Sequence, residues 1–190
     1  MDDDDLLRRA QRGDRDAFAD LVARHQDRLY TMLYRLLGNA ADAADVVQET
    51  FLRAYLHIDR LNGPGVRAWL FRVAVNCGRD LQRHNARRPH DPLDDGEGNV
   101  VDLPDPSQNP ERTALQRERV AEMNQLLRAL PLELRVALVL REVNQLSYEE
   151  IAQVLSIPVG TVKSRVNRAR MQFSALASDA AALVAAEGGG

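Results

Sequence analysis

The segment from Ser147 to Arg170 constrains the fold of this 190-residue chain more than any other stretch. Ser147 and Glu150 have the spacing of a capping box, in which both side chains reach unpaired amides at a helix start. Pro158 has no amide proton and suits the first turn of a second helix. Two short helices joined by a tight turn predict a helix-turn-helix, whose second helix can enter the DNA major groove.

The second of these helices combines an apolar stripe with a basic face. The stripe follows helical spacing and consists of Val162, Val166, Ala169 and Phe173. The residues that point away from it are Lys163, Ser164, Asn167 and Arg168, while Arg165 and Arg170 flank it. An ordinary solvated basic surface is the alternative, but the capped helix and turn before it favour DNA binding.

The composition favours an all-α fold. Hydrophobic residues make up 45% of the chain, which supports a core, and strand-like runs of alternating Val, Ile and Thr are absent. The single cysteine, Cys77, rules out a disulfide framework and is expected in the core. No apolar run reaches about 18 residues. Residues 2–5 are acidic where a signal peptide is basic, so we expect a cytoplasmic protein without membrane insertion.

The charge is unevenly distributed, although the net charge is only −3. Residues 67–88 hold six Arg and one Asp, and residues 163–170 hold four basic residues and no acid. By contrast, residues 91–111 hold seven acids and no Lys or Arg. An acidic protein with separate basic faces can bind DNA at those faces.

The Pro-rich acidic stretch 89–111 divides the chain. It lacks helical periodicity and predicts a flexible linker between two small helical domains, 1–88 and 112–177, followed by a tail, 178–190. A long surface loop within one domain is the alternative. The helices expected from periodicity are 2–11, 14–37, 41–58, 66–85, 113–130, 132–143, 147–155 and 159–177.

Two further surfaces follow from helical spacing. In the third long helix, Arg72, Asn76, Arg79 and Arg83 form one stripe, with Trp69 at its edge and Arg67 before it. Arginine side chains can contact successive phosphates of a nucleic-acid backbone, and an aromatic ring can stack on an unpaired base. An ordinary solvated surface with a half-buried Trp explains the same pattern of residues equally well. In the second long helix, Asp45, Gln48 and Glu49 are neighbours on the outer side, together with Asp42 and Arg53. The apolar residues of this helix, Tyr55 among them, are expected to point inward. That face predicts either solvent exposure or docking of a protein partner.

Five motifs in order resemble a bacterial RNA polymerase sigma factor of the extracytoplasmic-function (group IV, sigma-70 family) class. They are DVVQETFLRAY (45–55), AWLFRVAVN (68–76), LPLELR (130–135), LSYEEIA (146–152) and PVGTVKSR (158–165). The resemblance covers about 14–88 and 112–176. It implies a region 2 helical bundle and a four-helix region 4 domain with the helix-turn-helix.

The resemblance also implies roles for individual residues. The face with Asp45, Gln48, Glu49 and Arg53 corresponds to the contact with the β′ clamp helices of core polymerase. The −10 element, including a base flipped from the single-stranded non-template strand, corresponds to Leu61, Asn62, Arg67, Trp69, Arg72, Val73, Asn76, Arg79 and Arg83. The −35 element corresponds to Thr161, Lys163, Ser164, Arg165, Asn167 and Arg168. Further implied partners are the β flap and an anti-sigma factor.

Two other function classes compete with this interpretation. A stand-alone two-domain helix-turn-helix regulator remains the alternative, and a test of polymerase binding separates it from a sigma factor. An enzyme is disfavoured because the histidines, His25, His57, His84 and His90, are scattered and no catalytic cluster or phosphate loop is visible. We therefore expect no catalysis, no metal and no cofactor.

Overall fold

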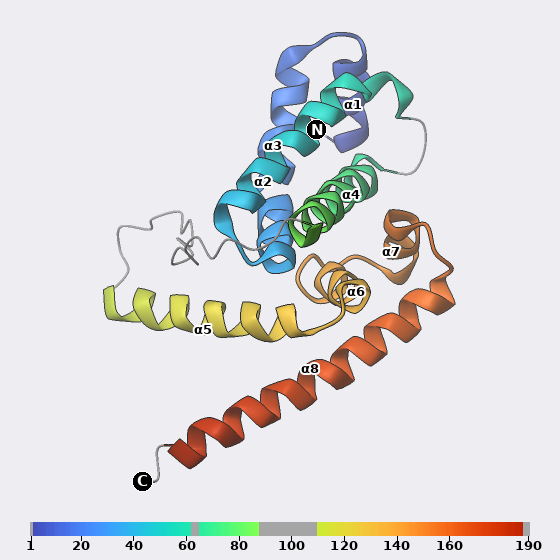
Figure 1. Ribbon diagram of the computed structural model, residues 1–190. Coiled ribbons are helices and arrows are strands. Elements are labelled where there is room, and N and C mark those ends of the chain that lie inside the picture. Colours follow the sequence, from blue (N-terminus) through green and yellow to red (C-terminus); the bar gives the residue numbers. More distant parts are fainter. Residues whose placement is uncertain (1, 62–64, 88–109, 188–190) are drawn as a thin grey trace.

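The computed structural model of the protein describes residues 2–61, 65–87 and 110–187, and every regular element in these ranges is a helix. The first half contains α1 (Asp3–Gln11), α2 (Arg15–Leu37), α3 (Ala40–Leu56), the short 3-10 helix η1 (Ile58–Arg60) and α4 (Val66–Arg87). The second half contains α5 (Pro110–Ala129), α6 (Leu132–Glu142), α7 (Tyr148–Leu155) and α8 (Val159–Glu187) (Figure 1). The expected all-α fold is confirmed.

The first half is a bundle whose helix ends have identifiable signals. The Asp14 side chain accepts hydrogen bonds from the amides of Asp16 and Ala17 at the start of α2. Gly38 ends α2 with a φ of +75°, a backbone conformation that favours glycine. Gly78 lets α4 approach α2 closely, because a Cβ there would lie 3.3 Å from the side chain of Leu33.

The second half is built around the buried helix α6. Its Arg135 donates from Nη2 to the carbonyls of Arg128 at 2.8 Å and Leu130 at 3.1 Å, which fixes the corner between α5 and α6. Helix α8 ends at Glu187, ten residues beyond the expected end at Ala177. The added segment is rich in alanine, the residue with the highest helix propensity, and three glycines follow it.

The two halves pack against each other. Helix α2 contacts α5 and α6, and α4 contacts α7. Arg135 Nη1 donates to the carbonyl of Leu36 at 2.8 Å, and Asn144 Nδ2 donates to that of Arg28 at 3.1 Å. The expected linker 89–111 lies outside the described residues except for its last two, which begin α5.

Candidate nucleic-acid interface

Helix α4 separates polar and apolar residues as its periodicity predicts. Leu70, Ala74 and Cys77 are buried on one side, whereas Arg72, Asn76 and Arg83 are exposed on the other. Burial raises the pKa of the Cys77 thiol, in keeping with a role in the core. The exposed side therefore combines cationic groups with an amide that can both donate and accept hydrogen bonds.

Residues in the first turn of α4 and just before the helix pack against the core. Trp69 and Leu61 are partly buried and line the same small hollow, whose volume is about 10 Å³. The carbonyl of Leu61 also accepts a hydrogen bond from Gln11 Nε2 at 3.2 Å. That volume accommodates at most about one water molecule, so the described residues around Trp69 and Leu61 form no base-sized pocket. Asn62 lies outside the described residues.

Three arginines of α4 contact the second half of the chain. Arg67 Nη2 donates to the carbonyl of Asn144 at 2.7 Å, and Arg79 Nη2 lies 3.1 Å from Glu133 Oε2. Arg72 donates to the carbonyl of Gln153. Arg83 instead pairs with Asp80, on its own helix. Sequence periodicity located this basic face but gave no indication of these long-range partners.

The helix-turn-helix has the predicted capping box. The amide of Glu150 donates to Ser147 Oγ at 3.0 Å, and the amide of Ser147 donates to Glu150 Oε2 at 2.7 Å. Ser156 ends α7 with a φ of +55°, and α8 begins directly after Pro158. These local signals place the turn between α7 and α8 where the sequence predicted it.

Helix α8 buries its apolar stripe and exposes its basic face. Val162, Val166 and Ala169 are fully buried. The exposed residues are Lys163, Ser164, Asn167 and Arg168, and Thr161 and Arg165 are partly buried. Arg165 Nη1 lies 2.6 Å from Glu133 Oε2, and Arg170 pairs with Glu142. Four of the six predicted −35 residues thus form an open polar face.

Helix α3 carries an acidic face on its outer side. Asp45 and Gln48 are exposed, and Glu49 Oε1 lies 2.6 Å from Arg53 Nε. Burial, and then the neighbouring Asp45 carboxylate, raise the pKa of Asp42. Next to Gln48, a groove of about 450 Å³ runs between α2 and α3 and includes Asp27, Tyr30 and Val47.

The same face is more apolar than the sequence interpretation allowed. Leu52 is 55% exposed and Leu56 is 65% exposed, one and two turns beyond Gln48. Tyr55 was expected to point inward but is 48% exposed, and its ring packs edge-on against Phe18 at 5.1 Å between centroids. The i, i+4 spacing of Leu52 and Leu56 within a polar face is the signal that could have identified this patch.

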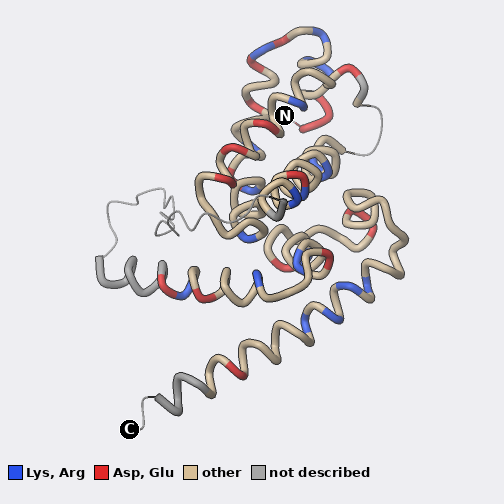
Figure 2. The backbone as a smooth tube through the Cα atoms, in the orientation of Figure 1, with Lys and Arg blue, Asp and Glu red and all other residues tan. Residues whose placement is uncertain are grey.

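The second half also contains an apolar groove. It has a volume of about 420 Å³ and is lined by Met123, Leu127, Leu138, Val139, Val143 and Phe173, with charged groups from Arg35, Glu142 and Arg170. Figure 2 shows basic residues along α4 and the first turns of α8, and acidic residues on α3. In the part of the chain that the structure describes, the candidate surfaces are therefore the basic faces of α4 and α8, the acidic and apolar face of α3, and the apolar groove.

The histidines that the structure describes, His25, His57 and His84, are scattered, and His57 is exposed at the end of α3. His25 is buried and its Nε2 lies 2.9 Å from Asp3 Oδ2, while His84 is exposed and His90 lies outside the described residues. In the described ranges, no three His, Cys, Asp or Glu side chains are grouped to hold a metal ion. No helix there is long and apolar enough to cross a membrane.

Two family models match the chain. The model described as sigma-70 region 2 matches residues 21–88, and the model described as sigma-70, region 4 matches residues 121–173. The first match contains the candidate faces of α3 and α4, and the second contains the helix-turn-helix.

Relatives match over most of their length. The RNA polymerase sigma-H factor of Pseudomonas aeruginosa is 38% identical, covering 88% of this chain and 90% of the relative. The ECF RNA polymerase sigma factor SigW of Bacillus subtilis is 36% identical, covering 86% and 90%. Among solved structures, CnrH in complex with the cytosolic domain of CnrY has a TM-score of 0.70 at 31% identity, covering 92% of this chain and 96% of that one. The sigma factor RpoE of Bartonella quintana, in complex with the anti-sigma factor NepR, has a TM-score of 0.62 at 23% identity, covering 85% and 96%, and supports the fold alone.

Proposed function

The chain belongs to the sigma-70 family and is an extracytoplasmic-function RNA polymerase sigma factor that directs transcription initiation at promoters; from this premise we propose which surface makes each contact. The proposal rests on one observation, which is where the helices of this chain place their polar faces. Helices α4 and α8 bury apolar stripes in one core and turn basic residues outward, while α3 exposes an acidic and apolar face. The stand-alone regulator is not favoured, because both sigma regions match.

Residues 1–88 form the domain that binds core polymerase and opens the −10 element. Asn76 contacts a base edge, and the arginines of α4 track the phosphates of the non-template strand. The residues assigned to this element are Leu61, Asn62, Arg67, Trp69, Arg72, Val73, Asn76, Arg79 and Arg83. The hollow between Leu61 and Trp69 is too small to hold a base, so a base-sized pocket requires further residues.

Residues 112–177 form the domain that binds the −35 element, tethered through the acidic linker 89–111. Lys163, Ser164, Asn167 and Arg168 enter the major groove because α8 exposes them together. Thr161 and Arg165 contribute from the edges of this face. Arg165 becomes available to DNA when it leaves Glu133.

The outer face of α3 binds the polymerase. Asp45, Gln48, Glu49 and Arg53 supply polar contacts to the β′ clamp helices, and Leu52 and Leu56 supply apolar area at the centre of the interface.

The apolar groove between α5, α6 and α8 suits a helix with an apolar face, such as one from the β flap. The related CnrH was solved in complex with the cytosolic domain of CnrY, which supports a protein partner for this chain, and the family resemblance implies that this partner is an anti-sigma factor. The protein works in the cytoplasm, where polymerase and promoter DNA are, and catalyses no reaction itself.

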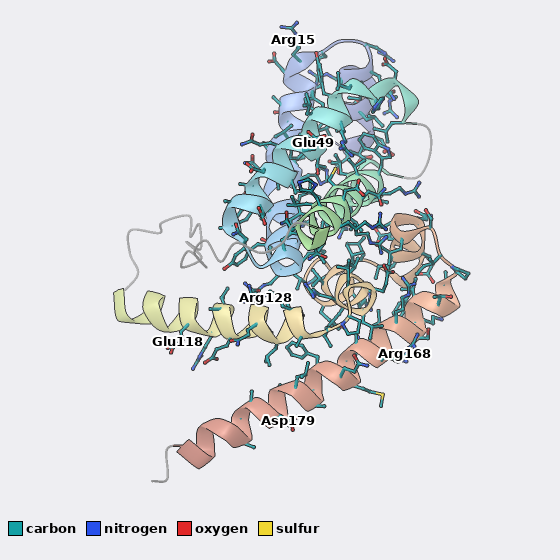
Figure 3. All side chains as sticks on the ribbon, in the orientation of Figure 1. Arg15, Glu49, Glu118, Arg128, Arg168 and Asp179 are labelled. Atoms are coloured by element: carbon teal, nitrogen blue, oxygen red, sulfur yellow. The ribbon has the colours of Figure 1, made fainter. Side chains whose placement is uncertain are left out.

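Site-specific photocrosslinking tests this division of contacts. A photoreactive amino acid is placed at Gln48, Asn76 or Asn167 in the full chain, and complexes are assembled with core polymerase on a promoter selected by run-off transcription. We expect Gln48 to crosslink to β′, Asn76 to the −10 non-template strand and Asn167 to the −35 duplex. A probe at Asp179, exposed far along α8, is the control (Figure 3). Crosslinks from Asn76 to protein alone would overturn the −10 assignment.

A further inference from the structure

A polar hollow lies where α2, the first turn of α4 and the loop between α6 and α7 meet. It has a volume of about 260 Å³ and is lined by Arg28, Arg67, Val143, Asn144 and Gln145. Small-molecule sites typically have volumes of about 300–1,000 Å³, so this hollow has the size for a small ligand. Its polar lining distinguishes it from the apolar groove between α5, α6 and α8.

The wall of this hollow contains two cations that its neighbours only partly neutralise. The lining residues include Arg28 and Arg67 but no carboxylate. The side chain of Arg28 is exposed and forms no hydrogen bond or ion pair with another residue of the described chain. Arg67 Nη1 lies 3.9 Å from Glu150 Oε1, while the other oxygen of Glu150 accepts a hydrogen bond from the Ser147 amide. The two guanidinium groups can therefore attract a further anion.

The same wall contains buried polar atoms without a partner among the described residues. They are Arg67 Nε and Asn144 Oδ1. Asn144 is only 7% exposed, and its Nδ2 donates to the carbonyl of Arg28 at 3.1 Å. Because buried polar groups in proteins normally form hydrogen bonds, these two atoms favour an occupant that both accepts and donates.

The neighbouring His25 also reflects the positive charge at this place. Burial is the main cause that lowers its pKa, the Asp3 carboxylate opposes the shift, and the cations of Arg28 and Arg67 lower the pKa further. The Asp3 carboxylate is already bonded to His25, at 2.9 Å between Oδ2 and Nε2. An anion in the hollow would therefore meet a positive local charge.

We propose that this hollow is a binding site for a small molecule that carries a phosphate group. Arg28 and Arg67 hold the phosphate, because guanidinium groups form charge-assisted and often bidentate hydrogen bonds with phosphate oxygens. A donor group of the ligand, such as the hydroxyl of a protonated phosphate, bonds to Asn144 Oδ1. The exposed side chain of Gln145 supplies a further donor at the rim. The site goes beyond the promoter contacts, with which it shares Arg67 alone.

Inorganic pyrophosphate is the probe, titrated into the full-length free chain at constant ionic strength and near pH 7. Isothermal titration calorimetry measures the dissociation constant, and a thermal melt measures the Tm. Arg28→Gln removes the cation that has no partner of its own. The matched control is Arg15→Gln, at an exposed position at the start of the same helix (Figure 3).

A second pair of variants tests the rim of the hollow. Gln145→Glu adds a negative charge without changing the size of the side chain, and Gln172→Glu makes the same change at an exposed position on α8. This pair decides the question if circular dichroism shows that Arg28→Gln is not folded.

We expect pyrophosphate to bind the wild-type chain and Arg15→Gln with the same dissociation constant. At ten times that concentration it should raise the Tm by about 3 °C. Arg28→Gln should weaken binding by about tenfold, because a charge-assisted hydrogen bond is lost. Gln145→Glu should also weaken binding, by repulsion, whereas Gln172→Glu should not.

Absence of binding to the wild-type chain, or equal constants for Arg28→Gln and Arg15→Gln, would overturn the site. Equal constants for Gln145→Glu and Gln172→Glu would overturn it as well. A single-stranded oligonucleotide is titrated as a separate arm. If the oligonucleotide binds in a way that depends on Arg28 and pyrophosphate does not, the hollow belongs to the DNA-binding surface and the small-molecule site is wrong.

Discussion

Glu49 accepts a hydrogen bond from Arg53 one turn further along α3, with 2.6 Å between Glu49 Oε1 and Arg53 Nε. Both side chains are almost half exposed, so the pair contributes little to the free energy of unfolding. Its consequence is an ordered polar patch beside Asp45 and Gln48 on the outward side of α3. Substitutions at this patch should change partner binding without changing stability.

The double substitution Asp45→Arg with Glu49→Arg should abolish binding to core polymerase. Reversing two charges at a polar interface introduces repulsion that costs several kcal/mol. A pull-down of core polymerase with the tagged chain measures the effect. The control carries Asp20→Arg and Asp179→Arg, which make the same total charge change at exposed sites elsewhere. Normal recovery of polymerase by the α3 double variant would contradict the docking assignment.

Asn76→Ala should impair promoter opening more than binding of closed DNA. Asn76 is exposed in the middle of the α4 face, where it can bond to a base edge. Loss of a bidentate base contact costs about 1–3 kcal/mol. Permanganate footprinting of the −10 region measures opening, and gel shift of a duplex −35 fragment measures binding. His84→Ala, exposed on the same helix, is the control, and equal losses in both assays would count against the −10 role of Asn76.

Arg168→Ala should give the opposite pattern. Arg168 is exposed on α8 and lies with Lys163, Ser164 and Asn167 on the face assigned to the −35 element. If Arg168 contacts a base, we expect binding of the duplex −35 fragment to weaken by about 1–3 kcal/mol. If it contacts a phosphate, the slope of the logarithm of the binding constant against the logarithm of the salt concentration should become shallower by about 1. A salt titration of binding distinguishes the two. Gln172→Ala, exposed one turn later, should bind as wild type does, and unchanged binding by Arg168→Ala would exclude it from the interface.

Local signals in the sequence were sufficient to predict the helix-turn-helix. The Ser147–Glu150 capping box, the position of Pro158 and the spacing of Val162 and Val166 each depend on residues within one or two turns. The same reasoning placed Arg72, Asn76 and Arg83 on the exposed side of α4. Helical periodicity determines which residues share a face, so these parts of the site follow from sequence alone.

Contacts between distant segments could not be predicted in this way. Arg79 and Glu133 are 54 residues apart, and nothing in either local pattern identifies the other as its partner. Tyr55 was assigned inward from its apolar character, but the packing of Phe18 leaves its ring half exposed. The extension of α8 to Glu187 was not predicted either. The high helix propensity of alanine favours a longer helix, whereas fraying favours a shorter one, and the spacing of apolar residues does not show which effect is stronger.

The buried His25 predicts a pH dependence of stability. Burial lowers the pKa of His25, although the Asp3 carboxylate opposes this shift. Because the unfolded chain then binds more protons than the folded protein, the free energy of unfolding falls as the pH drops below the ordinary value of about 6.5 and through the lower folded-state pKa. Between about pH 7.5 and 5.5, the Tm of the His25→Gln variant should therefore fall by less than the Tm of the wild-type protein. Exposed His57→Gln is the control, and equal losses in all three proteins would refute this coupling.

Run-off transcription tests most directly whether the chain works as a promoter-selecting polymerase subunit. Core polymerase is incubated with a library of templates randomised over the −35 and −10 regions, with the wild-type chain, with the Asp45→Arg and Glu49→Arg variant, or with neither. We predict discrete transcripts only with the wild-type chain, from templates that share one motif in each region. Transcripts that are identical with and without the chain would contradict the assignment of its function.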